Sequence, residues 1–369
     1  MGEALKKTPL FDAHVALQGK LVPFAGFEMP VQYPTGITAE HQAVRKTAGL
    51  FDVCHMGEFL LEGPQALDLI QKITVNDAST LNEWQAQYSA MCLESGGIID
   101  DLLVYRGPGH YMLVVNASNK DKDLAWVEKH AQEFDVEVTD KSDATALLAI
   151  QGPLASEIVG ALTASDLEGI GYYRFALGDV AGVDGIISRT GYTGEDGFEL
   201  YVPAEGGLDL WNALMEAGAS RGLTPTGLGC RDSLRLEMGY ALYGNDLDDE
   251  HTPLESGLGW ITKLDKGEFI GRDVLTKQKE EGVTRRLVGM KLTERGFPRH
   301  GYPVVSQGQD VGEVTSGVVS PSLGVGVAMG YVPTELAKAG TEVGVRIRDK
   351  VIPAVVQRPP FYAHGSVRR

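Results

Sequence analysis

Apolar runs and amphipathic stretches alternate along the first two thirds of the chain. Helical spacing of apolar residues indicates helices over residues 37–47, 64–70 and 120–132, and again around Trp211. Apolar runs that predict β-strands stand between them, at residues 58–61, 97–105, 111–115, 147–150, 186–189 and 198–202. Strands interleaved with helices in this rhythm predict mixed α+β modules, in which helices cover one face of an antiparallel sheet.

The pattern changes where the helical segment at residues 274–281 ends. Closely spaced short strands are typical of a small β-barrel or sandwich. We therefore expect residues 1–282 to form two interleaved α+β domains and residues 283–369 to form a C-terminal β-barrel domain. The barrel strand candidates are separated only by Gly, Pro and Ser turns, at residues 286–292, 302–305, 312–315, 327–331, 342–347 and 351–356.

One strand candidate carries two adjacent carboxylates, Asp100 and Asp101, inside the apolar run 97–105. A buried carboxylate that stays ionised needs a hydrogen-bond or ion-pair partner, because desolvation raises its pKa. Adjacent residues of a strand point to opposite faces of the sheet. The two aspartates therefore cannot act together on one ligand, and only one of them is expected to face any given pocket.

The segment from residue 188 to residue 200 packs three carboxylates and three glycines between two strands. Glu195 and Asp196 fit a solvated hairpin loop. Glu199 fits it poorly, because it lies within the apolar strand at 198–202. A carboxylate in that position could accept hydrogen bonds from the N–H and amino groups of a heterocycle in a two-point contact.

Two further polar residues stand at the ends of predicted elements. Asn116 ends the strand at 111–115, where capping of the next helix is the default expectation and contact with a ligand is the alternative. Arg231 begins a helix, where its positive charge opposes the helix dipole. This position indicates another partner for Arg231, either a ligand carboxylate or an acidic side chain.

The charge balance restricts the classes of partner. With 33 basic and 50 acidic residues the formal net charge is −17, which argues against nucleic acid, since phosphate contacts need clustered cations. One basic island nevertheless interrupts the acidic chain. It is either a solvated face or a docking patch for an acidic partner. The basic island consists of Arg285, Arg286, Lys291, Arg295, Arg299 and His300.

Several common classes of site and location are disfavoured. No run approaches the roughly 18 apolar residues of a membrane span, and the N-terminal segment lacks the apolar core of a secretory signal. Cys54, Cys92 and Cys230 are odd in number and far apart, which predicts a reducing cytoplasm and no metal site. The chain has no P-loop, no G-x-S-x-G elbow and no H-E-x-x-H motif.

Separated motifs in one order carry a family resemblance over essentially the full length. They are residues 8–11 (TPLF), 24–30 (FAGFEMP), 51–58 (FDVCHMGE), 96–101 (GGIIDD), 189–199 (RTGYTGEDGFE) and 231–237 (RDSLRLE). On these motifs the chain resembles the aminomethyltransferases of the glycine cleavage system, the T-protein family. The resemblance implies a three-domain, cloverleaf-like arrangement with tetrahydrofolate bound at its centre and no metal cofactor.

The resemblance also implies a reaction and a partner. An aminomethyl group on the lipoyl arm of the H-protein delivers its one-carbon unit to tetrahydrofolate, and ammonia, 5,10-methylenetetrahydrofolate and dihydrolipoyl H-protein leave. Asp101 matches the family's key aspartate and is expected beside the folate nitrogens that receive the carbon, with Asp100 on the opposite face. Folate contacts are implied for Tyr88, Val114, Asn116, Tyr192, Glu199, Arg231 and, in the C-terminal tail, Arg368.

Three related functions compete with this interpretation. A tetrahydrofolate-dependent demethylase of a small sulfonium or amine donor would use the same pocket without an H-protein. The flavin-fused oxidative members of the wider family are disfavoured, because no dinucleotide fingerprint or extra N-terminal length is present. The non-catalytic folate-binding iron–sulfur assembly factor carries a cysteine in a Lys-Gly-Cys-Tyr type motif, and the segment compared with it, residues 257–263, has no cysteine.

Overall fold

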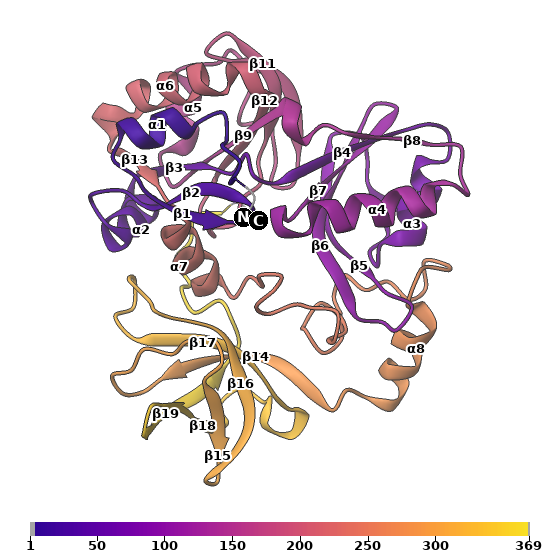
Figure 1. Cartoon of the computed structure of the whole chain (residues 1–369), viewed down its shortest axis with the longest axis vertical. Coiled ribbons are helices and arrows are strands. Elements are labelled where there is room, and N and C mark those ends of the chain that lie inside the picture. The colour runs from indigo at the N-terminus through magenta and orange to yellow at the C-terminus, as the bar shows by residue number, and fades with distance from the viewer. Residues whose placement is uncertain (1–3, 368–369) are drawn as a thin grey trace.

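The computed structural model describes residues 4–367 and shows three lobes around a common centre (Figure 1). Two lobes are mixed α+β units and the third is a β-barrel, so the predicted α+β fold with a cloverleaf-like arrangement is confirmed. Short 3-10 helices join several elements: η1 (Ala78–Thr80), η2 (Ala117–Asn119), η3 (Ser142–Ala144), η4 (Ala204–Gly206), η5 (Ala219–Arg221) and η6 (Thr334–Leu336).

The first lobe is built on a six-stranded sheet whose only parallel neighbours are β3 and β13. In order across the sheet its strands are β10 (Phe175–Val180), β11 (Val183–Ser188), β12 (Gly197–Pro203), β9 (Thr145–Gln151), β3 (Ala48–Asp52) and β13 (Leu223–Thr226). One face packs against α1 (Phe11–Ala16), α5 (Ala155–Gly160) and α6 (Gly207–Gly218). The other face meets α2 (Ile37–Lys46) and α7 (Leu228–Met238), beside the hairpin of β1 (Lys20–Phe24) and β2 (Phe27–Gln32).

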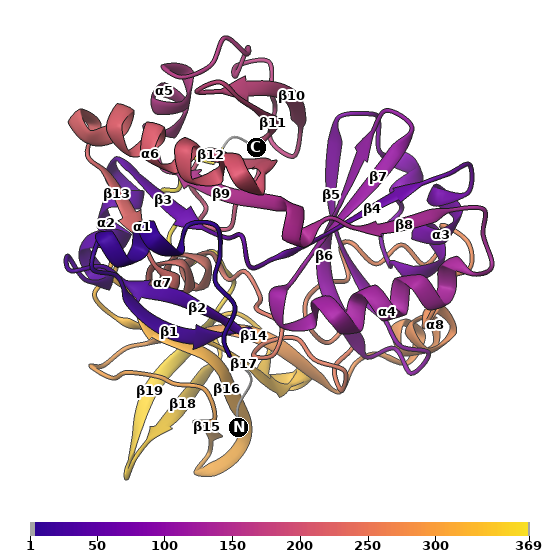
Figure 2. The same ribbon diagram turned by 45° about the horizontal axis from the view of Figure 1, so that its top comes forward.

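The second lobe is an antiparallel five-stranded sheet with helices on one face (Figure 2). Its strands in order are β5 (Gln85–Cys92), β6 (Ile98–Gly107), β7 (His110–Val115), β4 (Gly57–Glu62) and β8 (Glu137–Asp140). Alternate side chains of these strands pack under α3 (Ala66–Ile73) and α4 (Lys120–Ala131). The opposite side chains, including those of Tyr105 and Val114, form a shared apolar cluster with Phe51 and Tyr201 of the first lobe.

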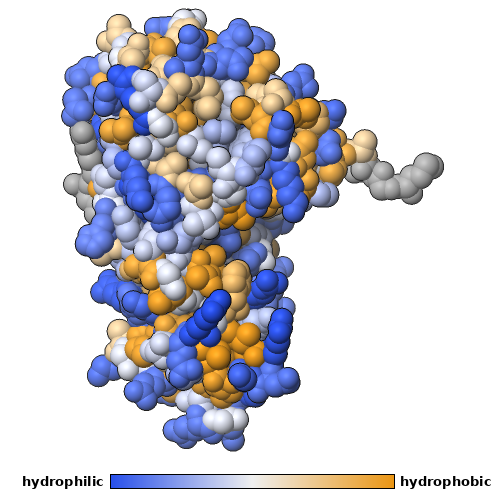
Figure 3. All heavy atoms as spheres, turned by 90° about the vertical axis from the view of Figure 1, so that its left-hand side faces the viewer, coloured by the Kyte–Doolittle hydropathy of each residue, from blue (hydrophilic) through white to orange (hydrophobic). Residues whose placement is uncertain are grey.

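The third lobe is a closed six-stranded barrel, reached through α8 (Arg272–Glu281). Figure 3 shows apolar residues gathered over this lobe at the bottom of the molecule, with hydrophilic residues between them. The first barrel strand begins at Arg285, close to the domain boundary predicted after residue 282. Around the barrel the order is β14 (Arg285–Leu292), β17 (Gly326–Pro333), β16 (Gln309–Val319), β15 (Pro303–Ser306), β18 (Glu342–Ile347) and β19 (Lys350–Gln357).

Gly97 fixes the start of β6 because another segment lies directly against its backbone. A Cβ atom at position 97 would lie 1.8 Å from the backbone oxygen of Asp249. The next residue, Ile98, donates its N–H to the carbonyl oxygens of Asp248 (3.0 Å) and His251 (3.1 Å). The segment that leads from α7 to α8 therefore holds the strand that carries both aspartates.

We expect Gly97→Ala to destabilise the protein by about 2 kcal/mol or more, because the new methyl group must displace backbone atoms rather than a flexible side chain. Gly160→Ala is the matched control, since its Cβ would lie 3.7 Å from the nearest atom, a methyl group of Leu167. Thermal unfolding of both variants checks this. Equal melting temperatures for the two variants would contradict the close approach at Gly97.

Candidate active site

The two aspartates of β6 lie on opposite faces of the five-stranded sheet, as strand alternation predicts. Asp100 shares the face of Leu102, which packs under α3 and α4, and its side chain is fully buried. Asp101 shares the face of Leu103, which looks toward the first lobe, and it is only half-buried. Asp101 is therefore the carboxylate that can meet a ligand between the two lobes.

Two hydrogen bonds hold the Asp101 carboxylate in place. The Tyr88 hydroxyl donates to Oδ2 (2.8 Å) and the Asn116 side-chain amide donates to Oδ1 (2.8 Å). In the pairing of β5 with β6, Ala90 lies opposite Asp101 and Tyr88 lies opposite Leu103. Tyr88 thus sits on the same face as Asp101, one diagonal step along the sheet.

The surroundings of Asp101 favour its protonated form. Burial, followed by the negative charge of Asp100, raises its pKa to about 7, while the hydrogen bonds from Tyr88 and Asn116 act in the opposite direction. A carboxyl group that titrates near neutral pH can both carry a charge and exchange a proton under working conditions. This combination is common at active sites.

Asn116 does not cap a helix, so the default expectation for it was wrong. It precedes η2, and its side chain makes no capping hydrogen bond. Instead Nδ2 donates to Oδ1 of both Asp100 (2.9 Å) and Asp101 (2.8 Å), and the backbone N–H donates to Oδ2 of Asp100 (3.0 Å). Charged acceptors form stronger hydrogen bonds than backbone groups do, so the carboxylate pair outcompetes the helix end.

A second group of predicted residues surrounds Arg231 on α7. Its guanidinium lies 4.8 Å from the ring centre of Tyr192, and that ring stacks on Tyr240 with 5.6 Å between ring centres. Within residues 4–367 the guanidinium of Arg231 forms no ion pair and no hydrogen bond, although the residue is half-buried. Burial lowers its pKa and the negative charge of Glu199 partly restores it. The predicted carboxylate partner is therefore near Arg231 without forming a direct pair.

Glu199 lies in the middle of β12, between Ser188 of β11 and Ala149 of β9. Its carboxyl is buried and receives one hydrogen bond, from the hydroxyl of Thr190 (2.5 Å). Burial raises its pKa, against the Thr190 hydrogen bond and the charge of Arg231. A buried carboxyl with a single donor retains acceptor capacity that a ligand can use.

The predicted site residues are thus joined into one set. Burial raises the pKa of Tyr192, and the charges of Asp101 and Arg231 both act on this pKa, so Tyr192 lies near both groups. Val114 lies in β7 opposite Leu103, fully buried in the cluster between the lobes. The role of each residue as a ligand contact stays a prediction, and Arg368 lies outside the described residues.

The expectation of a solvated loop for Glu195 and Asp196 was wrong. Both side chains are buried, and each is paired with an arginine. Arg45 of α2 contacts Glu195 (2.8 Å) and Arg189 contacts Asp196 (2.7 Å). These two ion pairs hold the loop that carries Tyr192 in place.

The C-terminal tail is attached to the same loop. The hydroxyl of Ser366 donates to Glu195 (2.6 Å), its backbone N–H does the same (2.8 Å), and the N–H of Val367 donates to the carbonyl of Gly194 (3.2 Å). The chain segment directly before Arg368 therefore lies beside the proposed site.

Two aromatic neighbours of this set, Tyr240 and Trp260, were not predicted from the sequence. The Trp260 side chain is 66% exposed, yet its ring stacks on Tyr88 with ring centres 6.3 Å apart. The sequence does contain one sign of this contact, a tryptophan within a polar, glycine-rich segment. Residue spacing does not show, however, that its ring lies against Tyr88, whose hydroxyl donates to Asp101.

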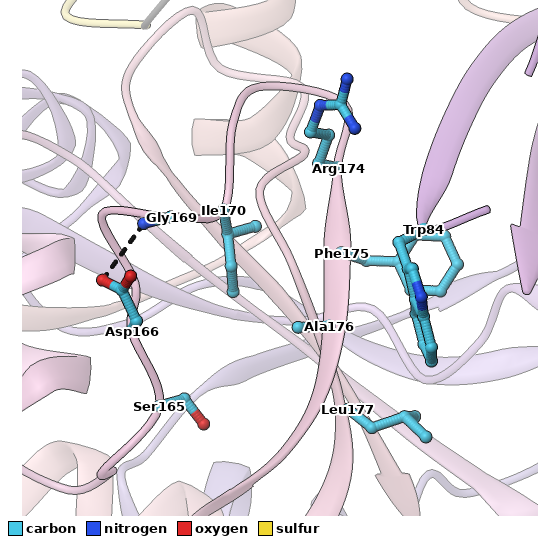
Figure 4. Close-up of a pocket in the computed structure, with 9 residues that line it drawn as sticks. All are labelled: Trp84, Ser165, Asp166, Gly169, Ile170, Arg174, Phe175, Ala176 and Leu177. Carbon is cyan, nitrogen blue, oxygen red and sulfur yellow. Dashed lines mark hydrogen bonds between the residues drawn. The ribbon is translucent and has the colours of Figure 1, made fainter. Parts of the chain in front are cut away.

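Other features of the described residues do not compete with this site. A surface hollow of about 570 Å³ beside β10 shares none of its lining residues with the site (Figure 4). Trp84, Phe175 and Leu177 line it, and Asp166 accepts a hydrogen bond from Gly169 at its edge. Within residues 4–367 no group of His, Cys, Asp or Glu side chains is placed to hold a metal, and no helix has the length and apolar character to cross a bilayer.

The raised pKa of Asp101 predicts that Asp101→Asn stabilises the fold above neutral pH. The folded-state pKa of about 7 exceeds the ordinary value of 3.8, so the wild type loses stability as pH rises through this interval. Asparagine is uncharged at every pH and loses no stability in this interval. We therefore expect the free energy of unfolding above neutral pH to rise by about 1 kcal/mol, after allowing for the partial exposure of Asp101.

Melting temperatures measured below pH 3.8 and above pH 7 test this expectation. The gain should appear only at the higher pH, and Asp121→Asn, at an exposed position of α4, is the control. A gain of equal size at both pH values would show that charge burial is not its cause.

Comparison with known proteins gives a consistent assignment. Residues 10–266 match the model of the GCVT N-terminal domain, and residues 285–363 match that of the glycine cleavage T-protein C-terminal barrel domain. The aminomethyltransferase of Halothermothrix orenii is 50% identical over 358 residues, covering 97% of this chain and all of that protein. The aminomethyltransferase of Moorella thermoacetica is 52% identical over 359 residues, covering 97% of this chain and 98% of that protein.

A solved structure supports the same conclusion. The aminomethyltransferase T of the glycine cleavage system from Bartonella henselae superposes with a TM-score of 0.93 at 36% identity, covering 99% of this chain and 100% of that one. Sequence, domain content and three-dimensional fold therefore agree over nearly the whole length. The chain belongs to the glycine cleavage T-protein family of aminomethyltransferases.

Proposed function

We propose that this aminomethyltransferase moves the one-carbon unit from aminomethyl-lipoyl H-protein to tetrahydrofolate, with Asp101 at the reacting nitrogens. Ammonia, 5,10-methylenetetrahydrofolate and dihydrolipoyl H-protein are the products. The observation that carries the proposal is the half-buried carboxylate of Asp101, held by Tyr88 and Asn116 and titrating near neutral pH. Nothing in the molecule or its relatives favours the demethylase or the iron–sulfur assembly factor.

The groups around Arg231 suit a folate. Its unpaired guanidinium can meet a ligand carboxylate or the face of a conjugated ring. The Glu199 carboxyl can accept from the N–H and amino groups along one edge of a pterin. The stacked rings of Tyr192 and Tyr240 offer an aromatic wall. Val114 packs on the same face of the sheet as Asp101, and the tail segment before Arg368 is hydrogen-bonded to the loop that carries Tyr192.

Asp101 contributes orientation and charge. Tetrahydrofolate supplies the nitrogen that accepts the carbon, and a fixed carboxylate beside that nitrogen holds it in place for attack. The same carboxylate stabilises the positive charge that develops as ammonia departs. Its pKa near 7 also allows it to take up the proton that the nucleophilic nitrogen loses.

The basic island offers a docking surface for the lipoyl-carrying partner. Arg286 is exposed near the beginning of β14, and Arg295 and Arg299 are exposed in the segment that follows the end of this strand. Between them Phe297 is 46% exposed, and the Arg299 guanidinium lies 4.9 Å from the centre of its ring. An exposed aromatic ring framed by cations is typical of a binding surface for an acidic protein.

We also propose a cytoplasmic location. Cys54, Cys92 and Cys230 are all buried and free, which fits a reducing compartment better than an oxidising one.

Asp101→Asn is expected to keep tetrahydrofolate affinity within about threefold while lowering turnover by about a hundredfold or more, because the amide keeps the shape but not the charge. Affinity is measured by calorimetry, and turnover in a reconstituted assay with aminomethylated H-protein. Asp121→Asn controls for loss of a carboxylate as such. Wild-type turnover in Asp101→Asn would exclude the proposed role.

Reversing two charges of the basic island should weaken H-protein binding. For Arg286→Glu with Arg295→Glu we expect a loss of about tenfold or more and a weaker dependence of the remaining affinity on salt. The control carries the same reversals at Lys141 and Lys338, which are also exposed. Binding is measured over a series of salt concentrations, and equal affinities for both double variants would place the docking surface elsewhere.

A further inference from the structure

Asp123 of α4 is buried beneath the site without an ordinary hydrogen-bond donor. Its side chain is 0% exposed. Among the described residues no N–H or O–H group donates to either of its carboxyl oxygens. Its polar neighbour is another acid: Asn119, one helical turn before Asp123, donates to Asp100 (2.7 Å), and the carboxyl groups of Asp100 and Asp123 each act on the pKa of the other. Two carboxyl groups in contact cannot both be ionised, so they share a proton.

The surroundings decide which of the two acids holds that proton. Asp100 accepts hydrogen bonds from the N–H (3.0 Å) and Nδ2 (2.9 Å) of Asn116 and from Nδ2 of Asn119 (2.7 Å). These donors stabilise an ionised Asp100, whereas Asp123 has none. Burial and the charge of Asp100 raise the pKa of Asp123 to about 11. Asp123 is therefore the neutral member and donates its O–H to Asp100.

The other charged and titratable groups near the pair do not replace this proton. Lys122 precedes Asp123, but its ammonium donates to the carbonyl of Ile99 (2.6 Å) and the hydroxyl of Tyr243 (3.1 Å). The Tyr243 hydroxyl in turn donates to the carbonyl of Ile98 (3.1 Å). Asp101, on the far face of β6, adds a further negative charge, which also favours the protonated form of Asp123.

We infer that Asp123 is a positioning residue for the proposed reaction: a buried neutral acid that donates to Asp100 and, through Asn116, fixes the Asp101 carboxylate. Asn116 makes the two links on the Asp101 side, with hydrogen bonds of 2.9 Å to Asp100 and 2.8 Å to Asp101, and the link from Asp123 to Asp100 is the inferred one. Asp123 donates to Asp100, Asp100 accepts from Asn116, and Asn116 donates to Asp101. The inference rests on the proposed function, because Asp101 is the group it serves.

Charge counting predicts how substitutions act. The pair of Asp123 and Asp100 carries one negative charge in the wild type, and Asp123→Asn keeps that charge because its amide donates as the acid does. Asp123→Leu removes this donor and places an apolar side chain there, so the pKa of Asp100 rises and Asp100 carries its negative charge over a narrower pH range. Asp101 then loses the repulsion that disfavours its ionised form, and its pKa falls.

The test is the pH profile of turnover in the complete system of enzyme, tetrahydrofolate and aminomethylated H-protein. For Asp123→Asn we expect turnover within about twofold of wild type and an unmoved acid limb. For Asp123→Leu we expect about tenfold lower turnover and an acid limb shifted by about one unit to lower pH. If Asp123 served only to hold α4 in place, its substitution would not move the acid limb of the pH profile. Equal losses in both variants, or an unmoved limb in Asp123→Leu, would overturn the inference.

A second measurement is independent of activity. The infrared difference spectrum of wild type against Asp123→Asn at neutral pH should contain the C=O band of one protonated carboxyl group. Its absence would overturn the inference even if Asp123→Leu does not fold. If the band is present but the wild type transfers no carbon to tetrahydrofolate, the proposed function fails while the protonation of Asp123 stands.

Discussion

The site depends on one neutral amide placed between two carboxylates. Removing ionised carboxylates from water costs several kcal/mol each unless hydrogen bonds replace the lost hydration. Asn116 donates to both Asp100 and Asp101 without neutralising either of them. The backbone N–H of Asn116 also donates to Asp100, so the end of β7 is joined to the beginning of β6. Asp100 is saturated with donors in this way, while Asp101 keeps acceptor capacity for a ligand.

Several other buried charges are paired with opposite charges, and their partners connect the lobes. Arg45 of α2 contacts both Glu195 and Glu237 at 2.8 Å, and Glu237 also accepts from serines of the loop between β16 and β17. Arg235 of α7 contacts Asp246 at 2.7 Å. Breaking such a pair leaves an uncompensated buried charge, which is strongly destabilising. Arg231, one helical turn before Arg235, has no such partner, and this contrast separates charges that hold the scaffold from charges available to a ligand.

Periodicity predicted most of the fold but not the polar partners. The barrel strands, the helices over 120–132 and around Trp211, and the opposite orientations of Asp100 and Asp101 follow from local spacing, and the structure agrees. The strand β5, which carries Tyr88, was not predicted because its sequence QAQYSAMC has no clear alternation.

The errors share one physical cause, which is distance along the chain. Glu195 was assigned to solvent because Arg45, its partner, precedes it by 150 residues. Asn116 was assigned to a helix end because the acids that bind it come from a neighbouring strand. Asp123 was partly readable, since it lies four residues before the buried Val127 and so on the same helical face. Residue spacing could not show that the neighbour of Asp123 is an acid, Asp100, rather than a base.

The unmatched groups are the ones that the ligand of the proposed function would have to satisfy. Arg231 lacks an anion, while Asp101 and Glu199 are carboxyl groups with raised pKa values and few donors. A ligand of uniform charge would satisfy one kind of group and repel the other. A molecule with a carboxylate tail and N–H donors along a flat ring satisfies both at once, and a reduced folate has this pattern. The same unpaired groups lower the stability of the protein without its ligand, because a charge that has no partner in the fold does not stabilise the fold.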